Sequence, residues 1–439
     1  MTRSLLAGCA AIAIIVGCGA AMADPAPGKF GITLGGDAYF TAGFVSQNAD
    51  DNGDGNGRRT TEFMNRFRLV ITPTARADNG LEYGGRLRVR ANGTATDQRA
   101  VDADVAYIYV SGNFGRIEAG VNDSPLMQNY VIAPNGFGSG GIDGDWSQNS
   151  TWFITNSTAN RGSTSLWYDT NGPFLESYPG GGFGSVLNNN QTTKLAYYTP
   201  KYFTTGENTG LFGMISYTPV AGLVNGSSHS NVNRLTRTAN GGTIPNHFGQ
   251  NNFGNYADVV EVGARYDASY ESGISVSTAA GYIGGSTNSD TGSGVLVRYN
   301  DLSAYYVGGQ IGYADFLIGG SYTNAGKSGY RKSGQVAGDM TSDQYNWTAG
   351  ISYTSGPVVV GFNYQHGNDA GDLAVVGNRT ADLYSVGVMY TLAPGLTEGL
   401  EYVRINTNNE PGISANPNTW SALRRENADL VLFKTALTF

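Results

Sequence analysis

The chain of 439 residues contains 64 glycines and 27 tyrosines, only 14% of its residues are charged, and its formal net charge is −8. This charged fraction lies well below the roughly 25% of ordinary soluble domains, and the acidic balance argues against a nucleic-acid-binding protein. No run of about 18 apolar residues follows the N-terminal segment, so we expect no transmembrane helix.

The N-terminus has the pattern of an export signal. Arg3 supplies a positive charge, Leu5–Gly17 an apolar segment and Ala21–Ala23 a small-residue cleavage site, as in secretory signal peptides. We therefore expect residues 1–23 to be removed and residues 24–439 to form one domain. Both cysteines, Cys9 and Cys18, lie in the signal, and a lipoprotein-type cleavage ahead of Cys18 is the less favoured alternative.

The first predicted strand, Gly31–Val45, alternates apolar and polar residues, which is the pattern of a strand with one face in an apolar medium and one in water. The acidic loop that follows contains Asp50, Asn52 and Asp54. These residues are spaced like the first half of an EF-hand loop, although the glutamate expected at its end comes one residue late. A calcium site and a solvated polar turn both stay open, and we expect no other cofactor.

The stretch Phe63–Gly93 predicts a β-hairpin whose polar face carries five arginines, Arg66, Arg68, Arg86, Arg88 and Arg90. If the turn centred on Ala77, Arg68 would face Arg86 and Arg66 would face Arg88. Like charges in such positions destabilise a sheet by roughly 0.2–1 kcal/mol per pair. Two interpretations stay open: a solvated strand face with arginines paired to nearby carboxylates, or a functional cationic wall.

Thirteen further strands are predicted along the rest of the chain: Asp102–Ser111, Arg116–Asn122, Thr192–Thr199, Thr209–Thr218, Asp258–Asp267, Gly273–Ile283, Leu302–Tyr313, Phe316–Tyr322, Gln344–Thr354, Pro357–Gln365, Ala381–Leu392, Leu396–Asn406 and Asn427–Phe439. The strand Asp102–Ser111 is apolar on both faces, so its orientation cannot be assigned from the pattern. The connections alternate between long and short, and the longest, Asp123–Gln191, follows the fifth strand.

This layout predicts an all-β fold: a transmembrane antiparallel β-barrel of 16 strands with short periplasmic turns and long extracellular loops. Strands of about 9–13 residues are long enough to cross a bilayer when tilted. The last strand presents an alternating apolar face that ends on Phe439, and in lipid such a face needs no partner sheet. A soluble two-sheet sandwich is the alternative, but its connections should not alternate so regularly between long and short.

The chain resembles the general diffusion porins of Gram-negative outer membranes, the trimeric 16-stranded type. The resemblance rests on the Phe439 ending and on the order and spacing of Asp78–Gly85, Gly112–Arg116 and Tyr197–Pro200. It implies a passive channel in the cell outer membrane for small hydrophilic solutes and ions. It also implies contact with outer-membrane lipid and assembly as a homotrimer.

The resemblance further implies a constriction. The loop Asp123–Gln191 would fold into the barrel, with Asp123, Asp143 and Asp145 as candidate acidic residues facing the five arginines. Two walls of opposite charge would set a transverse field across a narrow aqueous gap. The sign of ion selectivity stays open, because the net charge favours cations and the arginines favour anions.

Rival functions are a substrate-selective channel and a non-conducting structural or enzymatic outer-membrane barrel. The three histidines, His229, His247 and His366, fall in predicted loops and fit no zinc motif. His366 and Asp369 are the single pair of nearby residues that could serve as catalytic groups of a hydrolase. We therefore expect a protein that is not an enzyme.

Overall fold

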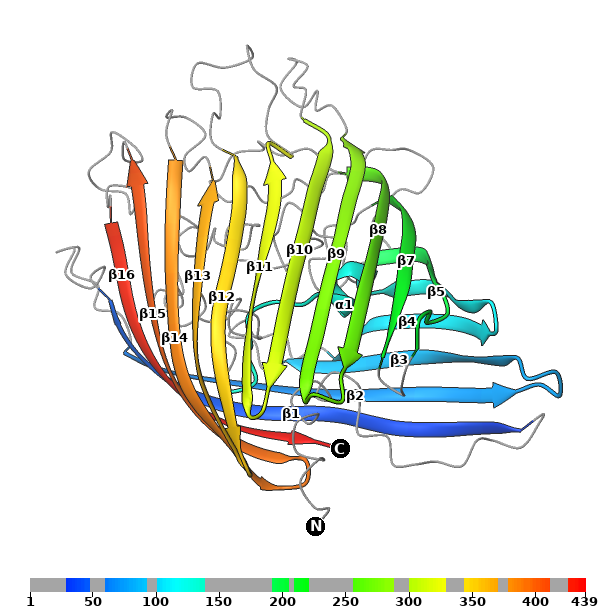
Figure 1. The fold of residues 1–439 in the computed structure, drawn as a ribbon, viewed down its shortest axis with the longest axis horizontal. Coiled ribbons are helices and arrows are strands. Elements are labelled where there is room, and N and C mark those ends of the chain that lie inside the picture. Colours follow the sequence, from blue (N-terminus) through cyan, green and yellow to red (C-terminus); the bar gives the residue numbers. More distant parts are fainter. Residues whose placement is uncertain are drawn as a thin grey trace.

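A computed structural model describes residues 29–47, 60–92, 101–138, 192–204, 209–220, 256–287, 300–328, 343–369, 378–410 and 425–439. Sixteen antiparallel strands close into one barrel, in which each strand pairs with its neighbours in sequence and β1 pairs with β16 (Figure 1). The predicted fold class is confirmed.

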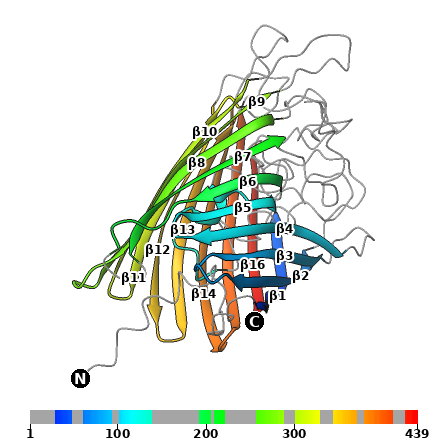
Figure 2. The same cartoon turned by 90° about the vertical axis from the view of Figure 1, so that its right-hand side faces the viewer.

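Each strand overlaps its predicted range. They are β1 (Phe30–Gln47), β2 (Thr61–Arg76), β3 (Glu82–Asn92), β4 (Val101–Gly112), β5 (Gly115–Asn122), β6 (Thr192–Tyr198), β7 (Gly210–Val220), β8 (Tyr256–Ser269), β9 (Ile274–Thr287), β10 (Leu302–Tyr313), β11 (Phe316–Gly326), β12 (Gln344–Ser355), β13 (Val358–Asp369), β14 (Asn378–Ala393), β15 (Leu396–Glu410) and β16 (Arg425–Thr438). β1–β4 cross the strands of the facing wall at a steep angle in Figure 1, and β2–β5 do so in Figure 2. Tilted strands on opposite walls of a barrel must cross in this way.

One short helix, α1 (Pro125–Asn129), follows β5. In the part of the chain that the structure describes, no helix is long and apolar enough to cross a membrane.

Several predicted features lie outside the described residues. They are the signal segment 1–23, the calcium candidates Asp50, Asn52 and Asp54, and the acidic candidates Asp143 and Asp145. His366 is described, and the prediction that it lies in a loop is wrong, because it belongs to β13.

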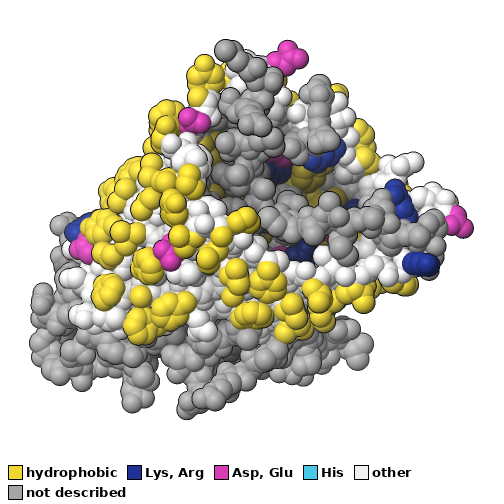
Figure 3. All heavy atoms as spheres, turned by 90° about the horizontal axis from the view of Figure 1, so that it is seen from below, with side chains coloured by type: hydrophobic (Ala, Val, Ile, Leu, Met, Phe, Trp, Pro, Cys, Tyr) yellow, Lys and Arg dark blue, Asp and Glu magenta, His cyan; other side chains and the backbone are white. Residues whose placement is uncertain are grey.

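Alternation along the strands separates an apolar outer surface from a mixed inner one. In β4, whose orientation the pattern left open, Tyr107 and Tyr109 are buried on the inside, whereas Ile108 and Val110 are exposed on the outside. Hydrophobic side chains spread over the outer surface in the view from below, and Lys and Arg side chains are visible inside the central hollow (Figure 3). This is the distribution expected of a barrel with a lipid-facing exterior.

The turn between β2 and β3 centres two residues later than the Ala77-centred turn considered from the sequence. The N–H of Ala77 donates to the carbonyl of Leu81 at 2.8 Å, and Gly80 has a φ of +86°, which glycine adopts at no steric cost. The later turn shifts the register of the whole hairpin.

The register pairs Arg68 with Arg90, Arg66 with Asn92 and Arg88 with Val70. The pairings Arg68–Arg86 and Arg66–Arg88, which an Ala77-centred turn would give, are therefore wrong. One directly opposed pair of arginines replaces the two expected, so the like-charge cost of this hairpin is smaller than the sequence suggested.

The ring closes at the last residue of the chain. The N–H of Gly36 donates to the carbonyl of Phe439 at 2.8 Å, and the N–H of Phe439 donates to the carbonyl of Gly36 at 3.1 Å. On the outer surface the Phe439 ring lies 5.9 Å from that of Phe67. A Cβ on Gly36 would lie 2.2 Å from the backbone oxygen of Arg68 on β2 and 3.0 Å from the Phe439 ring, so this position needs a glycine.

Candidate functional site: the ionic wall and the infolded loop

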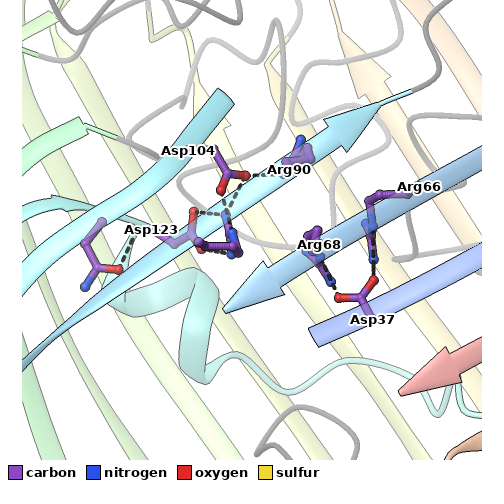
Figure 4. Close-up of polar contacts among 8 residues, drawn as sticks. Asp37, Arg66, Arg68, Arg90, Asp104 and Asp123 are labelled. Atoms are coloured by element: carbon purple, nitrogen blue, oxygen red, sulfur yellow. Dashed lines mark hydrogen bonds and ion pairs between the residues drawn. The ribbon is translucent and has the colours of Figure 1, made fainter. Parts of the chain in front are cut away.

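The arginines of β2 meet a carboxylate from β1 on the inner face. Asp37 lies opposite Arg68 in the register. The Nη2 of Arg66 donates to Asp37 Oδ2 at 2.8 Å, and the Nε of Arg68 donates to Oδ1 at 2.6 Å (Figure 4). The Arg66 guanidinium also lies 4.7 Å from the centre of the Tyr39 ring. One carboxylate therefore joins two arginines across neighbouring strands.

The arginines of β3 share a second carboxylate, Asp104 of β4. Arg88 donates to it through Nε at 2.7 Å and through Nη2 at 3.0 Å. The Nη2 of Arg90 lies 2.6 Å from Asp104 Oδ2 (Figure 4). The β3–β4 register shifts between Arg88 and Val89, which pair with Val105 and Ala103. Asp104 is therefore the extra residue of a β-bulge, a feature that re-aims side chains.

Asp123, at the end of β5, completes this part of the site. Its Oδ2 accepts from Arg88 Nη1 at 2.9 Å. We call the set the ionic wall, and it consists of Asp37, Arg66, Arg68, Arg86, Arg88, Arg90, Asp104 and Asp123. Its carboxylates come from the same side of the barrel as its arginines, because β1, β4 and β5 flank the arginine hairpin.

Four arginines of the ionic wall share three carboxylates, so the paired set keeps a positive charge. Arg66, Arg88 and Arg90 have side-chain exposures of only 10%, 13% and 16%. The buried Nε of Arg90 has no hydrogen-bond acceptor among the described residues. Donors therefore exceed acceptors in this cluster.

Arg86 differs from the other four arginines. It lies on the same face of β3 as Arg88, opposite Tyr107 of β4 in the register, but it is exposed. Within the described residues it forms no ion pair with a carboxylate. The ionic wall therefore combines four covered, paired guanidinium groups with one that is open to solvent.

The segment after β5 turns inward and runs along the inner faces of successive strands. The hydroxyl of Ser124 donates to Glu261 of β8 at 2.8 Å, Gln310 of β10 donates to the Ile132 carbonyl at 2.7 Å, and the N–H of Ala133 donates to Thr348 Oγ1 of β12 at 3.2 Å. We call residues 123–138 the infolded loop. Its course inside the barrel lies along the wall away from the arginine hairpin.

Glycines on the barrel wall make room for the infolded loop. A Cβ on Gly263 or on Gly281 would lie 2.3 Å from Leu126 Cδ2, and a Cβ on Gly361 would lie 2.3 Å from the Phe137 ring. Leu126 and Phe137 are 3% and 0% exposed. Side chains at these glycines would displace the loop, since closely packed interiors tolerate little added volume.

The start of the infolded loop, its root, lies over two buried charged side chains, Lys194 and Glu261. The Lys194 ammonium on β6 donates to the backbone carbonyl of Asn122, and Ser216 of β7 donates to Glu261 at 3.3 Å. Ser124 also accepts from the N–H of Met127 at 3.3 Å, as N-cap serines do. Lys194 and Glu261 therefore fix the point at which the chain leaves the wall.

Beyond this root, the infolded loop packs against an apolar cluster on the inner wall, beside the buried pair of Ser385 and Glu401. Leu383, Val403 and Leu430 of β14, β15 and β16 are at most 1% exposed and form one cluster with Val131 and Ile132 of the infolded loop. We call the inner wall that the infolded loop covers, from the glycines of β8 and β9 to this cluster, the loop-covered wall. Because its inner side chains are shielded, water in the barrel reaches the ionic wall more readily than this sector.

The structure thus places all five predicted arginines on one inner wall and brings Asp123 against Arg88. Asp37, Asp104, Lys194 and Glu261 did not enter the sequence-based site. Asp37 could have been found, because it follows the alternation of its strand, whereas a bulge places Asp104. Among the described residues no group of three His, Cys, Asp or Glu side chains could hold a metal ion.

A family model for Gram-negative porins matches residues 9–410 of the chain. The chain belongs to the Gram-negative porin family. As a member, it is an outer-membrane protein that crosses the membrane with its strands. A curated relative, an uncharacterized protein of Rickettsia prowazekii, is 24% identical over 417 residues and covers 87% of each chain.

Solved outer-membrane proteins have the same fold. The anion-selective porin from Comamonas acidovorans aligns with a TM-score of 0.52 at 13% identity, covering 94% of this porin and 100% of that chain. OmpT of Vibrio cholerae in its trimer form aligns with a TM-score of 0.50 at 11% identity, covering 93% and 99%. At these identities the likeness concerns the fold alone.

Proposed function

We propose that this porin is a passive diffusion channel for small hydrophilic solutes and ions, narrowed by the infolded loop. The observation that carries the proposal is the course of residues 123–138 across the inner faces of β8, β10 and β12. A segment held there reduces the aqueous cross-section and leaves the ionic wall as the charged side of the passage.

The charge balance of the ionic wall supports a local preference for anions. Four paired arginines share three carboxylates, and Arg86 adds a further exposed positive charge. Low-dielectric walls focus the field of such groups on the passage. Asp143 and Asp145 stay candidates for the acidic side of the constriction, and Asp50, Asn52 and Asp54 stay candidates for calcium.

The proposed assembly is a homotrimer in outer-membrane lipid, with residues 1–23 removed during export. The resemblance to trimeric porins supports the first point, and the A-x-A pattern at Ala21–Ala23 supports the second. N-terminal sequencing of the exported protein should begin at Asp24.

Conductance across a planar bilayer tests the proposed function. We expect a large, nearly ohmic conductance that closes in three equal steps. Flux that saturates with one solute would instead indicate a substrate-selective channel. A folded protein that inserts without conducting would contradict the proposal and favour a structural or enzymatic barrel.

A further inference from the structure

The outer faces of β13–β16 carry ionisable side chains where a lipid-facing surface should be apolar. In β13 and β14 the residues next to the infolded loop, Gly361 and Gly387, define the inner face. By alternation His366 and Asp382 lie on the outer face. Arg404 and Asp429 lie there for the same reason, since Val403 and Leu430 are buried on the inner one. These four strands are adjacent in the barrel (Figure 1).

The first group on this face centres on Asp382. The hydroxyl of Tyr364 donates to Asp382 Oδ1 at 2.5 Å, and His366 Nδ1 lies 2.9 Å from the same oxygen. The Trp347 ring stands 4.8 Å from the Tyr364 ring and 6.1 Å from that of His366. Aromatic rings with polar tips of this kind are enriched where a membrane meets water.

The second group centres on Asp429. Arg404 Nη1 contacts both carboxylate oxygens at 2.9 Å, the hydroxyl of Tyr402 donates to Oδ1 at 2.5 Å, and Arg404 Nε donates to Asn406 Oδ1 at 3.1 Å. Tyr384 of β14 lies opposite Arg404 in the register, so the two groups are neighbours. Together Tyr364, His366, Asp382, Tyr402, Arg404 and Asp429 form the outer-face network.

The network lies at one edge of the apolar band. Below it on β16, Val431, Phe433 and Leu437 are exposed on the outer face, down to the closing residue Phe439. The ten residues from Asp429 to Phe439 span about 25 Å along the membrane normal at a rise of ~3.3 Å and a tilt of about 40°. That is the height of the apolar band of such barrels, so the network lies at headgroup level on the long-loop side.

The network leaves polar atoms directed away from the barrel. The Arg404 side chain is 41% exposed, and His366 Nε2 and Asp382 Oδ2 have no hydrogen-bond partner among the described residues. Arg404 reaches both oxygens of Asp429 through Nη1 alone, and its exposed guanidinium can offer Nη2 to an acceptor outside the barrel. Such a group matches a phosphate in shape and charge.

We propose that the outer-face network binds the phosphate of a lipid headgroup in the leaflet next to the long loops. Arg404 holds the phosphate, Asp429 fixes the guanidinium plane, and the tyrosine and tryptophan rings line the headgroup level. The proposal depends on the position of the barrel in the membrane and not on whether its lumen conducts.

Native mass spectrometry of the refolded porin in a non-ionic detergent tests the proposal. Phosphatidylglycerol is titrated against wild type and Arg404→Gln, with diacylglycerol as the unphosphorylated probe. Losing a charge-assisted contact should weaken phosphatidylglycerol binding about tenfold and leave diacylglycerol binding unchanged. The control is Arg265→Gln, which removes a similar pair (Arg265 Nε–Asp267 Oδ2, 2.9 Å) beside the infolded loop.

If Arg404→Gln does not fold, Arg404→Lys keeps the charge, loses the planar guanidinium and should weaken binding several-fold. Equal affinity of wild type and either folded variant would overturn the proposal. Competition by inorganic phosphate as strong as by the lipid would assign the site to free phosphate instead. A variant that dissociates in lipid-free detergent would show that the network is a subunit contact, which also overturns it.

Discussion

The ionic wall and the loop-covered wall belong to one barrel and follow the same alternation of side chains. Their inward-pointing side chains, however, find different partners. The ionic wall pairs arginines of β2 and β3 with carboxylates of β1, β4 and β5. The loop-covered wall has glycines into which Leu126 and Phe137 pack, and apolar side chains that bury Val131. The inner face of one wall stays polar, and that of the other is covered by the infolded loop.

This difference shows what strand alternation specifies and what it does not. Alternation decides which side chains point inward. Whether that inward face meets water or protein depends on its volume and charge: glycines accept a packed segment, whereas buried arginines require carboxylates. We therefore expect the passage of the proposed channel to lie nearer the ionic wall.

The strongest way to break the ionic wall is to remove the carboxylate that two arginines share. Asp104→Asn should lower the free energy of unfolding by about 3–5 kcal/mol, because Arg88 and Arg90 would stay largely buried without their common partner. Chemical unfolding of the barrel in detergent measures this loss. Asp78→Asn, on the exposed β2–β3 turn, is the matched control, and an equal effect of both variants would contradict the structural role of Asp104.

A smaller effect is expected from crowding the loop-covered wall. The Cβ of Gly281→Ala would lie 2.3 Å from Leu126 Cδ2, so docking of the infolded loop should weaken by about 1–3 kcal/mol. We expect a larger and noisier single-channel conductance. On the outer face of β10, Gly309→Ala meets no atom closer than 3.6 Å and serves as the control. A Gly281→Ala channel indistinguishable from this control would mean that Leu126 does not set the aperture.

The smallest effect on stability, and the most direct test of selectivity, comes from Arg86. Arg86→Gln should leave the free energy of unfolding nearly unchanged, because Arg86 is exposed and forms no ion pair among the described residues. It should also move the reversal potential in a salt gradient toward cation preference. Arg88→Gln removes the same charge from a covered, paired position and should shift the potential less while destabilising the barrel. The reverse ranking would place the selective charge at Arg88.

The sequence contained enough information for the fold. Alternation, the long-then-short connections and the apolar face ending at Phe439 predicted the 16 strands and their lipid-facing side. These signals are local, because each depends on residues within one strand or one turn. Strand 4 could not be oriented from them, since Tyr107 and Ile108 are both apolar and their partners lie on other strands.

Long-range details of the site were less accessible. Asp37 shares the polar face of its strand with Tyr39, so its pairing with Arg68 could have been expected once β1 was placed beside β2. The inward orientation of Asp104 could not be predicted. It depends on a β-bulge that turns the side chain toward the arginines, and no residue type in the sequence marks this bulge. The course of the infolded loop depends on glycines such as Gly263 and Gly361, which come from strands far along the chain.

The seam between β1 and β16 is the contact that completes the barrel. Until the final strand arrives, β1 presents an unsatisfied row of backbone donors and acceptors that hydrocarbon cannot solvate. A chain that lacks β16 should therefore stay outside the bilayer, where cellular proteases can remove it. Insertion is thereby coupled to the pairing of the first and last strands, Asp37–Gln47 with Ala428–Thr438.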